Sequence, residues 1–182
     1  MGGAVSARHL SMLPAADDAW EGGLCLWIDD RSLGLPRRAG DRPVTRPNPH
    51  SQINQRPRWA AVERVFSAAA ALPWVVSDTT MCGSVGTLAL RVESHVAARD
   101  DTAFLTGREF AHFHPLPDGS LHLTLPPGVR EEAIATGWAE PHPFADRGAI
   151  SPLAVMVYAP RDEAEADVIS RLVRASWELA TG

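Results

Sequence analysis

REFAHFHPLPDGSLHLTL, residues 108–125, holds three of the seven histidines of this 182-residue chain and its strongest β-hairpin signal. An Asp-Gly pair in a Pro-bounded turn separates two runs in which apolar residues alternate with histidines, as in half-buried strands. If residues 114 and 120 close the loop, His112 and His122 face each other about 5 Å apart. The spacing therefore predicts a histidine face on one side of a sheet and a leucine-rich core face on the other.

The three histidines of this hairpin, His112, His114 and His122, allow three interpretations. Three imidazoles with open coordination positions can hold zinc for hydrolysis or another metal for oxygen chemistry. Against a metal, the segment has neither an HExxH motif nor the glutamate spacing of a cupin. A divalent metal site, a metal-free catalytic cluster and a plain polar surface therefore stay open as alternatives.

Glu109 stands three residues before the first of these histidines. In a regular strand its side chain points to the core face, where a buried carboxylate needs a partner. Either a distant arginine pairs with it, or a β-bulge at the start of the strand turns it toward the histidines. The first arrangement gives a structural ion pair, and the second brings Glu109 into the chemistry.

Patterns on both sides of the hairpin predict an α+β fold, a largely antiparallel sheet with helices packed on one face. We expect helices over residues 57–71, 126–137 and 162–180, and further strands over residues 74–77, 87–93, 103–106 and 152–160. These strands do not alternate regularly with helices, which argues against βαβ units. We expect a single domain over residues 42–182, preceded by a partly irregular N-terminal arm over residues 1–41 that is rich in Pro, Gly and Arg.

The composition excludes several classes of function. All 17 basic residues are arginine, so the chain can form neither a lysine Schiff base nor a Walker A loop. A net charge of −5 without a basic block argues against nucleic acid as a partner. No glycine fingerprint for a nicotinamide or flavin cofactor is present. We expect no membrane span and a cytoplasmic location, because the chain has no long apolar run, no signal-peptide pattern and only two distant cysteines, Cys25 and Cys82.

Several segments occur in the same order in one known domain. Beside the hairpin these are GWAEPHPFA at 137–145, YAPRDEAEADVISRLVRAS at 158–176 and, more loosely, NPHSQINQ at 48–55. Over roughly residues 42–180 the chain resembles the luciferase-like domain of the fungal bioluminescence luciferases, and it is most similar to the actinobacterial proteins that share this domain. It departs from the fungal enzymes in its arm and middle strands, and we expect no counterpart of their N-terminal membrane helix.

The resemblance implies oxidation of a small electron-rich enol. The fungal enzymes oxidise the α-pyrone 3-hydroxyhispidin with molecular oxygen as co-substrate, and release carbon dioxide and light without an added organic cofactor. On this basis we assign catalysis to His112, His114, His122 and Glu109, with His112 or His122 as the base. We expect a small aromatic or pyrone-like substrate to be bound by Arg108, Trp138, His142, Tyr158, Arg161, His50 and Gln55.

Two further functions compete with this luciferase-like oxidase. The first is a metal-dependent hydrolase or oxygenase built on the three hairpin histidines, which loss of bound metal in a His114 variant would identify. The second is a non-enzymatic domain that holds a planar ligand without turnover in air. We assign no oligomeric state from the sequence.

Overall fold

The computed structural model describes residues 32–80, 83–98 and 100–182. Most of the expected N-terminal arm and both cysteines lie outside these residues. Six strands form an antiparallel sheet, and their spatial order is β3 (Val75–Thr79), β4 (Leu88–Val92), β5 (Glu109–Phe113), β6 (Leu121–Thr124), β8 (Ala154–Val157) and β7 (Ala139–Pro141). A separate hairpin pairs β1 (Thr45–Pro47) with β2 (His50–Gln52).

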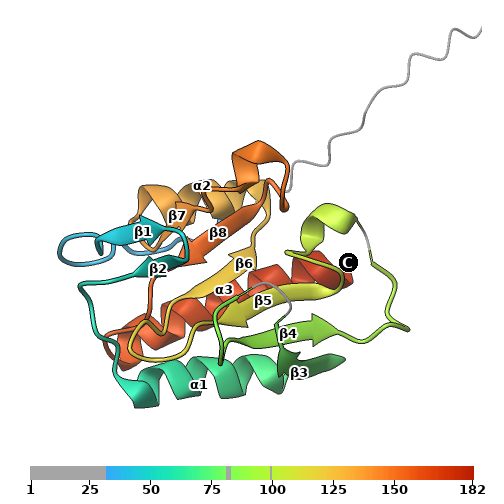
Figure 1. Cartoon of the computed structure of the whole chain (residues 1–182), viewed down its shortest axis with the longest axis horizontal. Coiled ribbons are helices and arrows are strands. Elements are labelled where there is room, and N and C mark those ends of the chain that lie inside the picture. Colours follow the sequence, from blue (N-terminus) through green and yellow to red (C-terminus); the bar gives the residue numbers. More distant parts are fainter. Residues whose placement is uncertain (1–31, 81–82, 99) are drawn as a thin grey trace, which may run out of the picture.

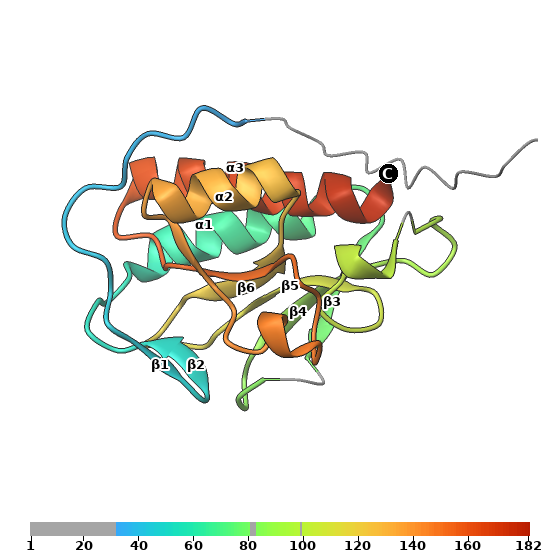
Figure 2. The same ribbon diagram turned by 90° about the horizontal axis from the view of Figure 1, so that it is seen from above.

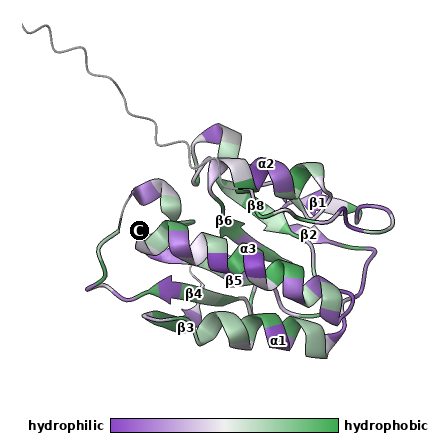
Figure 3. Cartoon of the chain, turned by 180° about the vertical axis from the view of Figure 1, so that it is seen from behind, coloured by the Kyte–Doolittle hydropathy of each residue, from purple (hydrophilic) through white to green (hydrophobic). Residues whose placement is uncertain are grey.

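The helices α1 (Trp59–Ala70), α2 (Pro127–Ala135) and α3 (Glu163–Thr181) cover one face of the sheet, and the β1–β2 hairpin lies on the other side (Figures 1 and 2). The predicted α+β class and the one-sided helical layer are therefore confirmed. Viewed from the helical side, α3 carries bands of hydrophilic residues between its hydrophobic ones (Figure 3). Among the described helices, none combines the length and the apolar character that crossing a membrane requires.

The helix boundaries follow local capping and one-sided burial. In α1 the buried residues Ala61, Val62, Val65 and Ala69 recur at helical spacing. The Asp162 carboxylate accepts a hydrogen bond of 2.9 Å from the Glu165 amide and so begins α3. These features confirm two of the predicted helices to within two residues at each end.

The central hairpin has the predicted register. His112 pairs with His122 and Phe113 pairs with Leu121 across β5 and β6. Phe113, Leu121 and Leu123 belong to the buried core under the helices. The histidines consequently project from the opposite face, because neighbouring strand residues point to opposite sides.

A β-bulge alters the first strand of this hairpin. Ala111 pairs with Leu90, but Arg91 pairs with Glu109, so Phe110 is one residue in excess on β5. Ser176 of α3 donates a 3.1 Å hydrogen bond to the Phe110 carbonyl that the bulge frees from the ladder. The extra residue turns Glu109 onto the histidine side, which confirms the second of the two arrangements predicted for it. An arginine contact as in the first arrangement is present as well, since Arg91 Nη2 lies 3.9 Å from Glu109 Oε2.

The strand predicted over residues 103–106 is wrong. The 3₁₀ helix η1 (Asp101–Ala103) occupies its beginning, and the Asp100 carboxylate caps it through the Thr102 amide at 2.6 Å. The Leu105 amide then donates to the Glu109 carbonyl at 2.7 Å, so the chain reverses directly before β5. Gly107, with a φ of 55°, makes this tight reversal possible.

The last ten residues of the expected arm pack against the domain. The Leu33 and Leu35 amides donate to the Glu132 carboxylate of α2 at 2.7 and 2.6 Å. The Arg38 amide donates to the Thr136 carbonyl just beyond this helix at 2.9 Å. Because Leu35 is also buried in the core, this segment is part of the packed structure.

Candidate functional site

Five histidines meet on the face of the sheet that the helices leave free. They are His50 of β2, His112 of β5, His114 in the turn after β5, His122 of β6 and His142 in the loop after β7. All five are buried and line one pocket of about 760 Å³. Gln55 lines the same pocket. The structure thus adds two distant histidines to the three of the hairpin, and both had been assigned to substrate binding.

Three of these rings form a hydrogen-bonded chain between two carboxylates. His112 Nε2 lies 3.0 Å from His122 Nδ1, and His122 Nε2 lies 3.1 Å from His50 Nδ1. At one end His112 Nδ1 donates to Glu109 Oε1 at 2.6 Å, and at the other His50 Nε2 donates to Glu140 Oε1 at 2.7 Å. The carboxylates, which only accept, therefore fix which nitrogen carries the hydrogen on both outer rings.

Each carboxylate is itself held by a hydroxyl group. The Thr80 hydroxyl lies 3.0 Å from both Glu109 oxygens, and the Tyr158 hydroxyl donates to Glu140 Oε2 at 2.9 Å. The exposed fraction of Glu109 is 0%, so its contact with His112 is sheltered from water. Such sheltered, charge-assisted hydrogen bonds hold imidazole rings in fixed orientations.

The hydrogen-bonded row of His112, His122 and His50 has one hydrogen too few to satisfy all of its contacts when the three rings are neutral. With neutral rings, His50 Nδ1 and His112 Nε2 are both acceptors, because their other nitrogens donate to the carboxylates. His122 lies between them and has one hydrogen for two acceptors. One nitrogen–nitrogen contact of about 3 Å therefore joins two lone pairs, an unfavourable arrangement that an added proton or a cation would relieve.

The electrostatic setting favours the neutral form of three of the rings, His112, His122 and His142. Burial lowers the pKa of His122 well below its usual value, and the surrounding imidazoles lower it further. Burial also lowers the pKa of His112, although the Glu109 carboxylate opposes the change. Burial and the neighbouring histidines lower the pKa of His142 to about 4. Near neutral pH the cluster thus presents lone pairs, the form that binds a cation.

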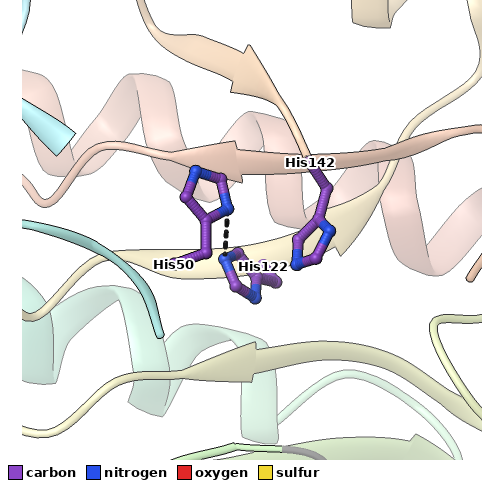
Figure 4. Close-up of side chains that lie close together, drawn as sticks. All are labelled: His50, His122 and His142. Carbon is purple, nitrogen blue, oxygen red and sulfur yellow. Dashed lines mark hydrogen bonds between the residues drawn. The ribbon is translucent and has the colours of Figure 1, made fainter. Parts of the chain in front are cut away.

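The two remaining histidines have opposite tautomers. His114 Nδ1 donates to Asp118 Oδ2 at 2.7 Å, which leaves its Nε2 as an acceptor. His142 Nδ1 accepts from the Phe144 amide at 3.2 Å, so its hydrogen lies on Nε2. Figure 4 shows His142 beside the hydrogen-bonded pair of His50 and His122. His142 is therefore suited to donate to a ligand, and His114 is suited to accept from one or to ligate a metal.

Four residues expected to bind substrate lie outside the pocket lining. Arg108 donates to the Val92 and Val96 carbonyls, and its guanidinium stacks on a phenylalanine ring. Trp138 Nε1 donates to the Pro36 carbonyl at 2.6 Å. The other two are Tyr158, which is bound to Glu140, and Arg161, which pairs with Glu165. In this structure all four hold neighbouring segments together.

Sequence reasoning identified Glu109 as an acidic partner of the histidines but missed the other two, Asp118 and Glu140. Asp118 had been read only as a turn residue, although its place in the hairpin loop could have suggested a contact with His114. Glu140, two residues before His142, stood in a segment quoted for the resemblance and had been given no role. We expected Trp138 and Tyr158 to form an apolar wall for the substrate, but the apolar wall of the pocket consists of Leu105, Leu116, Phe144 and Ile150.

Comparison with known proteins agrees with the resemblance seen in the sequence. The family model described as "Luciferase domain" matches residues 107–176, which include four of the five clustered histidines. The luciferase of Armillaria ostoyae is 32% identical over 173 residues, and that of Neonothopanus nambi is 31% identical over 175. Each alignment covers 82% of this chain and 61% of the relative, so the chain spans about three fifths of their length. No solved structure matches.

Proposed function

We propose, from the premise that this chain carries a luciferase-like domain, that it is an oxygen-dependent oxidoreductase acting on a small electron-rich enol. The observation that supports the proposal is the pocket itself, whose lining combines five buried histidines with the apolar side chains named above. A volume of about 760 Å³ suits a small planar molecule of the pyrone or phenol class. The fungal relatives share the domain, and their pyrone substrate is the natural first compound to test.

The cluster is built to stabilise negative charge on such a substrate. An enol reacts with oxygen after it loses its hydroxyl proton and becomes an enolate. A positive charge placed between His112 and His122 would satisfy their facing lone pairs and lie close to the enolate oxygen. His142 Nε2–H would donate a hydrogen bond to the same ligand. We therefore assign His112 and His122 to one unit rather than to separate roles.

The apolar wall and two arginines complete the proposed substrate site. Phe144 lies 5.6 Å from the His142 ring, measured between centroids, and offers a face for an aromatic ring. Arg46 and Arg56 also line the pocket and bring positive charge near the ligand. The pocket thus favours a planar molecule that becomes anionic during the reaction.

The test is oxygen consumption by the purified chain mixed with 3-hydroxyhispidin and with a panel of simpler enols and pyrones. We expect uptake above that of heat-denatured protein, and a loss of about 100-fold or more in His112→Ala and His122→Ala. His95→Ala is the matched control, because this histidine is exposed, lies outside the pocket and pairs with Glu93. Uptake that is unchanged in both pocket variants, or absent with every compound, would overturn the proposal.

A further inference from the structure

We propose that His112, His114 and His122 bind one divalent transition-metal ion, with its open coordination positions facing the pocket. This inference deepens the proposed function and rests on it for its catalytic meaning. The three ligand nitrogens lie within 4.8 Å of one another, and all three residues are buried. Such a site contains three protein ligands and leaves room for a further molecule, the arrangement of catalytic rather than structural metal centres.

Carboxylates hold the outer nitrogens of two of these rings and so leave the inner nitrogens as acceptors. Glu109 accepts from His112 Nδ1 at 2.6 Å, and Asp118 accepts from His114 Nδ1 at 2.7 Å. Both Nε2 atoms are then free to ligate. Metal-binding histidines in proteins almost always donate their second ring hydrogen to such a carboxylate.

The third ligand is oriented through one more ring. Glu140 accepts from His50 Nε2, so His50 Nδ1 is an acceptor, and in the metal-bound form the one hydrogen of His122 lies on Nε2 and donates to it across 3.1 Å. This arrangement leaves His122 Nδ1 with a lone pair that faces His112 Nε2 at 3.0 Å. Two nitrogens bound to one tetrahedral metal at about 2.0–2.1 Å lie about 3.3 Å apart, so a shift of a few tenths of an ångström brings this pair to that spacing. The nitrogens of the whole group lie within 4.8 Å of one another, so the ion would draw His114 toward the pair.

A second group of histidines, His50, His122 and His142, also has three nitrogens within 4.8 Å. It is less suited to a metal because His142 Nδ1 accepts a hydrogen bond from the Phe144 amide. Its Nε2 therefore carries the hydrogen, and to ligate there the ring would have to place a hydrogen against that amide. The two groups share His122, so one ion is expected, and it lies on the hairpin side.

The ligand set also restricts the kind of metal. Three neutral imidazoles suit zinc, iron, copper or nickel, whereas calcium and magnesium prefer oxygen ligands. The ion would supply the positive charge that the chain of imidazoles lacks. An enolate oxygen of the substrate could occupy one of its open positions, which ties the metal to the oxidation proposed above.

The experiment uses the untagged 182-residue chain, stripped with a chelator, desalted and titrated with Zn²⁺ and Co²⁺. We expect one Zn²⁺ per chain by calorimetry and mass spectrometry, and visible absorption from Co²⁺ bound at the same site. His114→Ala should remove metal binding, because it deletes a ligand. The row of hydrogen bonds that links Glu109 to Glu140 through three other histidines stays intact. His142→Ala is the matched control and should bind metal as the wild type does. Circular dichroism establishes that both variants are folded.

A second variant protects the test against misfolding of the first. Asp118→Asn keeps the shape of the turn but weakens the acceptor of His114 Nδ1, and we expect metal affinity to fall by about 10–100-fold. Failure of the wild type to bind either ion would overturn the inference. Equal binding by His114→Ala and the wild type would do the same, as would loss of binding only in His142→Ala.

Oxygen uptake separates this inference from the proposed function. If the stripped chain binds no metal but still oxidises an enol, the metal site fails and the proposed function stands, with the substrate's own proton shared between His112 and His122. If the chain binds metal with the expected pattern of variants but consumes no oxygen with any enol, the site stands and the proposed function fails.

Discussion

Two buried polar clusters in this chain are built on opposite plans. Around Glu165, opposite charges meet: Arg38 Nη2 lies 3.1 Å from Oε2, and Arg161 Nε donates to Oε1 at 2.8 Å. In the pocket, like groups meet, and the row of imidazoles lacks one positive charge. The first arrangement has the pairing of a structural ion cluster. The second is incomplete in a way that a ligand can complete, which is typical of functional sites.

The charge-paired cluster explains three residues that the sequence had assigned to substrate binding. Trp138, Tyr158 and Arg161 were expected to touch substrate because they stand in segments shared with the luciferase-like domain. In the structure the Arg38 guanidinium lies over the rings of Trp138 and Tyr158, at 5.8 and 5.4 Å from their centroids. Arg161 belongs to the charge-paired cluster and the two aromatic rings pack against it, so a shared motif can mark the framework of a domain as well as its chemistry.

The largest expected effect is on stability, in Glu165→Ala. The substitution leaves Arg38 buried without its carboxylate, and breaking such a pair costs about 3–5 kcal/mol of the free energy of unfolding. Urea denaturation measures the loss. The matched control is Glu163→Ala, which removes an exposed contact to Arg64 from the same helix turn and should change stability little. If Glu165→Ala were as stable as the control, this cluster would not be the structural one.

The next effect is on the pocket, in Glu140→Gln. The change removes the charged acceptor of His50 Nε2 and so loosens the tautomer of His122. We expect turnover or metal affinity to fall by about 10–100-fold, with a smaller change in the free energy of unfolding. Tyr158→Phe is the companion variant, because it removes one hydrogen bond from Glu140 without altering its charge. Equal losses in the two variants would mean that the carboxylate charge is not what matters.

The smallest effect is a pH dependence of stability that belongs to Glu165. Burial alone would raise the pKa of this carboxyl, but hydrogen bonds from Arg161 and the charge of Arg38 outweigh burial and hold the pKa below its usual value. The stability it contributes is present above the unfolded-state pKa of about 4.3 and is lost as the pH falls through the folded-state pKa. The difference in unfolding free energy between the wild type and Glu165→Gln should therefore shrink between pH 7 and acid pH. A difference that stays constant would contradict this linkage.

The hairpin could be predicted because its information is local. Alternating residues and an Asp-Gly turn determine the register of β5 on β6, and the pairing of His112 with His122 follows. The sequence allowed a bulge at the start of β5 but could not decide between a bulge and a regular strand. That choice depends on how β4 pairs with β5 and on the contact of Ser176 in α3 with Phe110. The strand expected over residues 103–106 failed for a related reason, since Asp100 and Gly107 turn the chain there.

The complete site could not be assembled from the sequence. His50 lies 62 residues before the first hairpin histidine, and His142 lies 20 residues after the last. They reach His122 only because the β1–β2 hairpin and the loop after β7 pack onto the sheet. The same distance hid Glu140, whose partner is 90 residues away in the chain. The tautomer of His50 depends on this long-range contact, whereas His112, His114 and His142 are oriented by partners two to four residues away.

The alternation of the central hairpin has a consequence for how such a domain can diversify. The leucines of β6 belong entirely to the buried core, while His122 between them belongs entirely to the pocket. Substitutions on the pocket side can therefore accumulate without disturbing the hydrophobic core. Substitutions in the core can likewise be compensated by other core residues without changing the pocket residues. A lineage could exchange one substrate for another through the wall residues alone, while inheriting the same scaffold unchanged.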